Sequence, residues 1–316
     1  MAERGVRSGS APHDQAEARP ICAFCLTPQP LVESHIIPKF VYQHLLATSP
    51  GRMRNVEAPN RRVQDGVKVP LLCAECEGRF SKWESAFARQ VFVPFHVATD
   101  ATPAYGPWGL KFAASIVWRV ATFMAMRDEL RHLLPSQMQH LEHALGSWKS
   151  FLQAEREHPG DHEIHLYPLD VLDSASGTVS SALNRYLLRG IDMDVISTCS
   201  TTVVYAKLVG LVFVGMVQKR YGSAEWRGGK MRVRIGAVPP GVFRMPAHMR
   251  RYMNDRASRM FAAMNSLSPR QQQVLSDAQH RDPDATASSE AFRAMTADLA
   301  LSGQVAFSTY DDNAET

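Results

Sequence analysis

Four of the five cysteines stand in two pairs that have the spacing of metal ligands. The first pair is Cys22 and Cys25 in "PICAFCLTP", and the second is Cys73 and Cys76 in "PLLCAECEGRFSKWE". In a reducing compartment, C-x-x-C units are more typical of zinc sites than of disulfides. Two units supply the four thiolates of a tetrahedral Zn²⁺ and leave no open coordination position. The pattern therefore predicts a structural zinc, and four unrelated buried cysteines are the weaker alternative.

A single histidine, His35 in "ESHIIPKF", lies between the two cysteine pairs. If the cysteines complete the zinc site, this histidine is free for other chemistry. A neutral imidazole with an ordinary pKa can accept a proton at physiological pH. The alternative is a histidine whose ring bonds to the backbone and only stabilises the fold. Its position between two zinc-binding pairs, followed by Ile-Ile-Pro, favours the catalytic or metal-linked role.

The sequence from the first cysteine pair through "SHIIPKF" to "LLCAECE" resembles the zinc-containing, treble-clef branch of the HNH (His-Me finger) endonucleases. The usual pattern of that family is a cysteine pair, Asp-His followed by Ile and Pro, an Asn, and a second cysteine pair that opens a helix with His. "CEGRFSKWE" also resembles a motif of uncharacterised bacterial HNH-like proteins. The resemblance covers residues 20–95 only. It implies a zinc-bound ββα domain at this end of the chain.

The resemblance implies a metal-dependent nuclease that hydrolyses phosphodiester bonds, with DNA favoured over RNA as the substrate. His35 would be the general base that takes a proton from the attacking water. The metal-binding histidine of the family falls on Glu77, whose carboxylate is a suitable ligand for a catalytic Mg²⁺ or Mn²⁺. Glu33 is the second expected ligand, because it shares one face of a strand with His35.

Two positions depart from the family pattern. Ser34 stands where an acid often precedes the base, and no asparagine lies just ahead of the second cysteine pair. Asn55 and Asn60 are the nearest asparagines, and Asp65 is closer. These departures support an alternative function, a catalytically inactive zinc module that binds nucleic acid or protein. A third alternative places the activity in residues 160–240, where no catalytic constellation supports it.

The residues after Cys76 predict a helix with one buried face. Glu77 and Glu84 lie two turns apart on it, about 10 Å along the axis, so they are not expected to bind the same small ion. Glu84 is instead expected to support the site or the fold. The apolar residues that recur at three- and four-residue steps are Phe80, Trp83, Phe87 and Val91.

Basic residues are frequent between and after the cysteine pairs. The insertion "GRMRNVEAPNRRVQDGVK" has the composition of turns, so its basic side chains should be exposed and able to contact phosphates. A solvated loop is an equal alternative. The formal charge of +4 permits nucleic-acid binding without requiring it. The candidate contacts are Arg52, Arg54, Arg61, Arg62, Lys68, Arg79 and Lys82.

The whole chain of 316 residues predicts an α+β protein with two domains. Residues 1–19 are expected to form a disordered leader and residues 303–316 a flexible tail. Residues 20–95 form the predicted zinc-binding domain. Residues 106–302 form a larger domain of unknown role that mixes helices with antiparallel strands.

Within the larger domain, the apolar pattern changes twice. Residues 106–157 predict two helices, the first apolar nearly all round. Residues 163–236 alternate with a period of two between glycine-rich turns and predict four strand segments. Helices return over residues 245–302. The segments predicted as strands are "HEIHLYPL", "RYLLRGIDMDVIST", the run 201–218 and "KMRVRIGAV".

The most apolar run, "TTVVYAKLVGLVFVGMVQKR", carries Lys207 and many β-branched residues and predicts a buried β-hairpin, not a membrane span. The chain opens on polar residues without a secretory signal, so the expected location is the cytoplasm. A protein partner is a further expectation for the larger domain. Cys199 is expected to be a small core residue. The histidines without a partner pattern, expected to be solvated or to cap helices, are His96, His132, His140 and His143.

Overall fold

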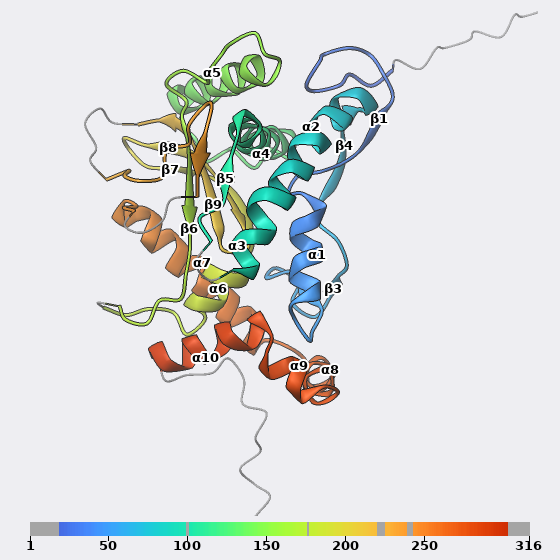
Figure 1. Ribbon diagram of the computed structural model, residues 1–316, viewed down its shortest axis with the longest axis vertical. Coiled ribbons are helices and arrows are strands. Elements are labelled where there is room, and N and C mark those ends of the chain that lie inside the picture. Colours follow the sequence, from blue (N-terminus) through green and yellow to red (C-terminus); the bar gives the residue numbers. More distant parts are fainter. Residues whose placement is uncertain (1–18, 99–100, 176, 220–224, 239–242, 303–316) are drawn as a thin grey trace, which may run out of the picture.

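The computed structural model is a mixed α+β protein in which a small two-stranded unit packs on the long helices that cover a four-stranded sheet (Figure 1). The predicted leader, except for Arg19, and the predicted tail lie outside the described residues. The structure describes residues 19–98, 101–175, 177–219, 225–238 and 243–302.

The two cysteine pairs lie in a compact unit of two strands and a helix. Strand β1 (Leu31–His35) pairs antiparallel with β4 (Lys68–Cys73), and helix α2 (Ala74–Phe87) begins directly after β4. The first cysteine pair precedes β1, and the second spans the junction of β4 and α2. The unit therefore has the order strand, strand, helix over the residues predicted to bind zinc.

The insertion between β1 and β4 has its own elements. Helix α1 (Lys39–Ala47) follows the Ile-Ile-Pro run, and a short hairpin joins β2 (Met53–Arg54) to β3 (Arg62–Val63). Pro38 occupies the N-cap of α1, where its missing N–H costs no helical hydrogen bond.

Helix α2 continues past Phe87 through one π-helical turn. This turn, η1 (Ala88–Phe92), leads into α3 (Val93–Val97). The predicted apolar face is confirmed, because Phe80, Phe87 and Val91 are fully buried and Trp83 packs against the core. The helix therefore continues past the cysteine unit and ends in α3.

A four-stranded antiparallel sheet forms the centre of the larger part of the chain. Its strand order is β6-β9-β8-β7. The predicted hairpin over 201–218 is confirmed, and its turn places Val209 and Gly210 at positive φ (41° and 77°). The bounds are β6 (Ile164–Pro168), β7 (Ile191–Ser197), β8 (Thr202–Leu208) and β9 (Leu211–Gln218).

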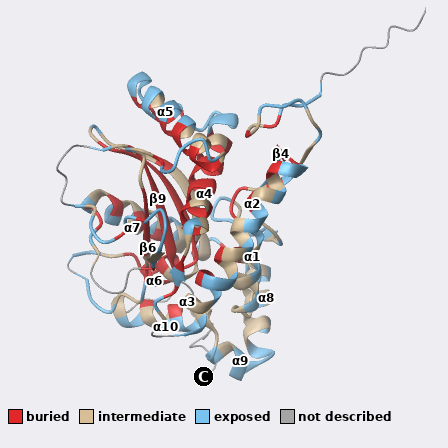
Figure 2. Cartoon of the chain, turned by 45° about the horizontal axis from the view of Figure 1, so that its top comes forward, coloured by how far each residue is buried: buried red, intermediate tan, exposed pale blue. Residues whose placement is uncertain are grey.

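Helices cover both faces of this sheet. Helices α4 (Pro107–Met126) and α5 (Pro135–Leu152) cover one face, and α6 (Leu183–Arg189) and α7 (Ala247–Asn265) cover the other. Helix α4 is long and apolar enough to cross a membrane, but 78% of its most apolar window is buried inside the protein (Figure 2). Its hydrophobicity is explained by its place between the sheet and the cysteine unit.

Two predicted strands are wrong in part. The first half of "RYLLRGIDMDVIST" lies in α6, because Leu183, Tyr186 and Leu187 pack at helical spacing against the cluster around α7. In "KMRVRIGAV" the strand is β10 (Gly236–Ala237), which pairs with β5 (Ala104–Tyr105), while Lys230 forms a single β-bridge to His165 of β6 in the main sheet.

Three further helices follow α7, in agreement with the helical prediction for residues 245–302. They are α8 (Pro269–His280), α9 (Pro283–Ala287) and α10 (Glu290–Ser302). Buried Asp298 of α10 accepts hydrogen bonds from the Arg185 guanidinium at 2.7 Å and from the N–H of Asn184 at 2.6 Å. These bonds join the end of the described chain to α6.

One cluster of buried side chains runs from Cys22 to Val238. Phe87 of α2 stacks on Phe112 of α4 with ring centroids 4.0 Å apart, and both rings contact Phe213 of β9. The cysteine unit and the sheet therefore share a hydrophobic core. The division into two domains remains a prediction from sequence.

Gly215 of β9 tests the packing between the sheet and α5. A Cβ at this position would lie 2.8 Å from the Trp148 ring and 3.1 Å from Val117. We expect Gly215→Ala to lower the free energy of unfolding by about 1–3 kcal/mol, because both neighbours belong to the core. In the control Gly146→Ala, the new Cβ meets nothing within 4 Å on α5, and stability should stay equal or rise. Urea denaturation of the wild type and both variants checks the prediction. A Gly215→Ala variant as stable as the wild type would contradict it.

Lys207 of β8 is completely buried, and its ammonium donates to the carbonyl oxygen of Gly190 at 2.9 Å. Burial lowers the pKa of Lys207 to about 7 in the folded chain. The unfolded chain then binds more protons between about pH 7 and the ordinary lysine pKa near 10.4, so stability should rise with pH in that window. Lys207→Met should remove this rise, as measured by urea denaturation at pH 7 and pH 9. An unchanged pH dependence in the variant would contradict the prediction.

Candidate functional site

The four cysteines converge on one point, as their spacing predicts. Their sulfur atoms all lie within 4.8 Å of one another, and Sγ of Cys25 is 3.9 Å from Sγ of Cys73. A tetrahedral Zn²⁺ with Zn–S bonds of about 2.3 Å has sulfur–sulfur edges of about 3.8 Å. The geometry of the cluster therefore fits one zinc ion.

The first knuckle is shaped by its backbone. The N–H of Leu26 donates to the carbonyl oxygen of Cys22 at 2.9 Å, and Leu26 takes a positive φ of 61° to close the turn. The N–H of Cys73 donates to Sγ of Cys22 at 3.3 Å, and the N–H of Ala23 donates to the carbonyl oxygen of Leu71 at 3.1 Å. These contacts hold the two cysteine pairs together across β4.

The electrostatics of the cluster call for a cation. A hydrogen bond from Thr27 lowers the pKa of Cys25 to about 6, whereas burial raises the pKa of the Cys76 thiol above its usual range. Four thiolates cannot be held at so buried a place without positive charge, and a bound Zn²⁺ supplies it. The cluster can therefore hold a structural zinc.

Phe24, the residue between the first two cysteines, joins the cluster to the rest of the protein. Its ring is fully buried and packs edge-on against Phe80 of α2 at 5.0 Å and Trp118 of α4 at 5.4 Å. The knuckle is therefore fixed to α2 and α4 as well as to the metal ligands.

His35 ends β1 and is paired with Asp65. Nε2 of His35 lies 2.9 Å from Oδ1 of Asp65, and Nζ of Lys68 lies 2.5 Å from the other carboxylate oxygen. Burial alone would raise the pKa of Asp65, but the hydrogen bonds from Lys68, His35 and the N–H of Gly66 lower it below its usual range. The carboxylate is therefore ionised at neutral pH and accepts both bonds.

This pairing fixes the tautomer of the imidazole. An ionised carboxylate only accepts hydrogen bonds, so Nε2 of His35 carries the proton and the neutral ring keeps its lone pair on Nδ1. The ring is mostly enclosed, with 16% of the side chain exposed. The pair has the arrangement of an oriented base, in which an acid holds one nitrogen and the other can take a proton.

Glu77 contacts Ser34, not His35. The hydroxyl of Ser34 donates to Oε2 of Glu77 at 2.7 Å, and Ser34 is fully buried beneath α2. Successive side chains of a strand point to opposite faces, so His35 and Glu33 point away from this contact. Over the described part of the chain, no hydrogen bond or ion pair joins Glu33 to Glu77. Glu77 therefore lies on the opposite side of β1 from His35 and Glu33.

Glu84 has the supporting role expected from its position. Its carboxylate forms an ion pair at 2.6 Å with Arg119, which is fully buried in the middle of α4. The Arg119 guanidinium also donates to the carbonyl oxygen of His35 at 2.8 Å. Glu84 therefore holds the guanidinium that fixes the backbone of the candidate base.

Some of the basic side chains predicted to contact nucleic acid are bound to other residues of the protein, and the others are exposed. Arg54 is half-buried and donates to Pro59 and Gln271, and Lys68 is bound to Asp65. Arg79 pairs with Glu75 at 3.5 Å on the surface of α2. The remaining candidates are exposed: Arg52, Arg61, Arg62 and Lys82.

Three of these arginines line a cleft of about 320 Å³ between the β2–β3 hairpin and α8. Arg281, just after α8, also lines it, and Asp277 is the one acidic residue among the lining side chains. The cleft therefore carries a net positive charge and suits an anionic group. The arginines from the hairpin are Arg52, Arg54 and Arg62.

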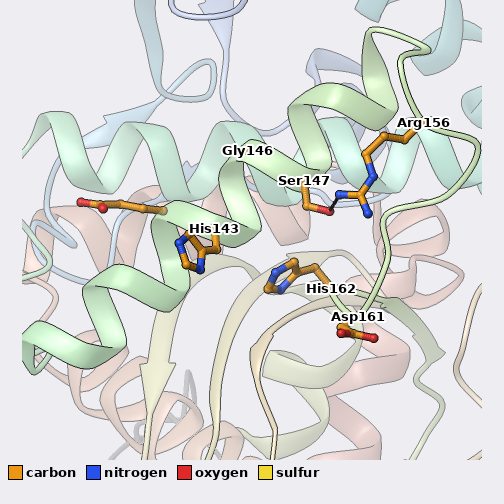
Figure 3. Close-up of a pocket in the computed structure, with 7 residues that line it drawn as sticks. His143, Gly146, Ser147, Arg156, Asp161 and His162 are labelled. Atoms are coloured by element: carbon orange, nitrogen blue, oxygen red, sulfur yellow. Dashed lines mark hydrogen bonds between the residues drawn. The ribbon is translucent and has the colours of Figure 1, made fainter.

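A second hollow, shown in Figure 3, lies between α5 and the segment that leads to β6 and has a volume of about 410 Å³. Its serine, Ser147, donates to the carbonyl oxygen of Pro159 at 2.8 Å and accepts a bond from Arg156 at 2.8 Å. Nδ1 of His162 is bound to the carbonyl oxygen of Met216, and burial lowers the pKa of His162. These groups are committed to the fold and do not form a nucleophile–base pair.

Sequence reasoning missed two residues of the site. The sequence marks Asp65 only by its nearness to the second cysteine pair, and Arg119 lies inside a helix expected to be apolar. The signal for Asp65 is "QDG", in which Gly66 lets the chain turn beside Tyr42; a Cβ there would lie 2.2 Å from that ring. Cys199 is exposed in the turn between β7 and β8, so its predicted core position is wrong.

Comparison of the chain with protein-family models, with curated proteins and with solved structures finds no match. The resemblance to HNH nucleases therefore depends on the residues of the cysteine unit alone and remains a prediction.

The cysteine cluster predicts a bound metal that stabilises the chain. We expect Cys73→Ser to hold one equivalent of zinc fewer than the wild type and to melt at a lower temperature, because metal-binding free energy contributes to folding. Exposed Cys199 gives the matched control, since Cys199→Ser should change neither quantity. Metal analysis and thermal denaturation of the purified chains check this. Equal zinc content in Cys73→Ser and the wild type would contradict the assignment.

Proposed function

We propose that the chain is a metal-dependent nuclease of HNH type that hydrolyses phosphodiester bonds, with DNA as the favoured substrate. The observation that carries the proposal is the His35–Asp65–Lys68 group, with its 2.9 Å imidazole–carboxylate contact, at the end of the strand that leads from one cysteine pair toward the other. A histidine held in one tautomer by an ionised carboxylate supports general-base chemistry more strongly than a solvated histidine would.

The proposed reaction is the hydrolysis of one P–O bond. Nδ1 of His35 takes a proton from water while the water oxygen forms a bond to phosphorus and the bond to the 3′-oxygen breaks. The leaving oxygen ends as a 3′-hydroxyl after it gains a proton, and the phosphate stays on the 5′ end. Asp65 keeps the imidazole oriented and stabilises its charge when it becomes protonated.

A divalent ion would supply charge stabilisation at the phosphate oxygens. Mg²⁺ retains several waters and is commonly bound through one or two carboxylates and the substrate phosphate, so Glu77 is sufficient as a first protein ligand. One oxygen of Glu77 accepts the Ser34 hydroxyl, which leaves its other oxygen for this role. Glu33 is exposed and is the candidate ligand on the side of β1 that carries His35, whereas Glu77 is the candidate on the side of Ser34.

The positive cleft supports nucleic acid as the partner. Its arginines come from the insertion between the cysteine pairs and from the end of α8, so phosphate contacts would involve both the insertion and the C-terminal helices. A cysteine-only zinc site fits a reducing compartment, which agrees with the proposed cytoplasmic location. The role of the larger part, residues 106–302, as a surface for a protein partner stays a proposal.

The alternative is a zinc module that binds nucleic acid or protein without cleaving it. The Ser34–Glu77 hydrogen bond favours this alternative, because it ties the Glu77 carboxylate to a hydroxyl at the position where the family often has an acid. The two proposals share the zinc cluster and the positive cleft. They differ only in whether His35 and Glu77 act on a substrate.

Cleavage of supercoiled plasmid in Mg²⁺ or Mn²⁺ separates the two. We expect the wild type to nick the plasmid and His35→Ala to lower the rate by about 10²–10⁴-fold, which is the usual contribution of a general base. Asp65→Asn should give a smaller loss, because the imidazole remains but loses its orienting acid. Glu77→Gln should raise the concentration of metal that is required.

Surface His140 provides the matched control, since His140→Gln removes a histidine far from β1 along the chain and should keep the wild-type rate. Zinc content and circular dichroism of each variant show whether it is folded. If the folded wild type never nicks DNA or RNA but retards it in a gel, the binding module is correct. If His35→Ala nicks at the wild-type rate, His35 is not the base.

A further inference from the structure

Two histidines and a glutamate meet away from the cysteine cluster. His44 lies on α1, His96 on α3, and Glu290 is the first residue of α10 (Figure 1). Their potential ligand atoms all lie within 4.8 Å of one another. Helices from the start, the middle and the end of the described chain therefore bring three metal-binding groups together.

The distances within this group are those of a metal site. Nε2 of His44 lies 3.1 Å from one oxygen of Glu290, and Nδ1 of His96 lies 4.0 Å from the other. Two ligand atoms bound to one Zn²⁺ at about 2.1 Å lie at most about 4.2 Å apart, so both contacts are within reach. The two imidazole rings lie against each other, with centroids 4.2 Å apart.

His96 gives an independent sign of a missing partner. Only 9% of its side chain is exposed, and its ring interacts with the backbone of Val209, although Nε2 makes no hydrogen bond of standard geometry. Its Nδ1 is 4.0 Å from the nearest carboxylate oxygen, which is too long for a hydrogen bond. An ion bound to Nδ1 would give this buried nitrogen the partner that it otherwise lacks. The expectation that His96 is solvated or caps a helix is therefore corrected.

The remaining contacts orient the carboxylate. Arg189 of α6 lies 2.5 Å from Oε2 of Glu290 and also donates to the hydroxyl of Thr48 at 2.7 Å and to the carbonyl oxygen of Leu45 at 3.0 Å. The guanidinium is fixed by groups other than Glu290, so it holds one carboxylate oxygen and leaves Oε1 directed toward His96. Hydrogen bonds of this kind commonly orient the ligands of protein metal sites.

We propose that His44, His96 and Glu290 bind a second divalent transition-metal ion, of the class of Zn²⁺. Two imidazoles and one carboxylate suit zinc and its neighbours, whereas Mg²⁺ and Ca²⁺ prefer oxygen ligands alone. The ion joins α10 to α1 and α3, so it fixes the C-terminal helices against the cysteine unit. The proposal does not depend on nuclease activity.

Metal stoichiometry tests the proposal on the full chain. After loading with excess Zn²⁺ and removal of unbound metal, the wild type should hold two equivalents, one at the cysteines and one here. His96→Gln and Glu290→Gln should each hold one. His140→Gln, which changes an exposed histidine on α5, should hold two. One equivalent in the wild type, or two in folded Glu290→Gln, would overturn the proposal.

Cobalt distinguishes the two sites and reports whether a variant is folded. Co²⁺ bound to four thiolates gives intense sulfur-to-metal absorption, whereas Co²⁺ bound to nitrogen and oxygen gives only weak visible bands. Titration of the wild type should show both signals, and Glu290→Gln should keep the thiolate signal and lose the weak one. Loss of both signals would mean that the variant is unfolded, and the wild-type stoichiometry then decides alone. A wild type with the thiolate signal only would overturn the proposal.

Discussion

The buried guanidinium of Arg119 is the contact on which the arrangement around the cysteine unit depends. It lies in the middle of α4 with no exposure to solvent, and a charge in such a place must be paired. Glu84 of α2 supplies the opposite charge, and the carbonyl oxygens of His35 and Ser115 accept its remaining bonds. The Arg119 side chain therefore holds α4, α2 and the end of β1 together.

The contact with Arg119 helps to hold His35, the candidate base, in place although this residue ends its strand. The backbone of His35 is held by Arg119 from one side and by pairing with β4 from the other, while its ring is held by Asp65. The cysteine cluster lies at the other ends of β1 and β4, where Leu31 pairs with Cys73. The short two-stranded unit would be marginal alone and gains its rigidity from these attachments.

The sequence predicts what short-range patterns determine. The cysteine pairs, the helix after Cys76, the hairpin over 201–218 and the long helices follow from spacing and periodicity, and the structure contains them. Contacts set by the three-dimensional path of the chain were not predictable. Asp65 reaches His35 through the folded insertion, and Arg119 is 84 residues from His35 inside a helix whose composition predicts only burial.

The same limit applies to the group formed by His44, His96 and Glu290, whose members lie on three separate helices. Helix α6 is also set by tertiary packing. Its residues have the periodicity of a strand, but they form a helix that packs against α7.

The products of plasmid cleavage test the central claim, that His35 directs water onto a phosphodiester, most directly. Water attack with departure of the 3′-oxygen leaves a 3′-hydroxyl and a 5′-phosphate, and DNA ligase reseals such a nick. The account predicts nicks from the zinc-loaded wild type in Mg²⁺ that ligase closes, and almost none from folded His35→Ala. An inert wild type, or equal numbers of resealable nicks from both proteins, would contradict it.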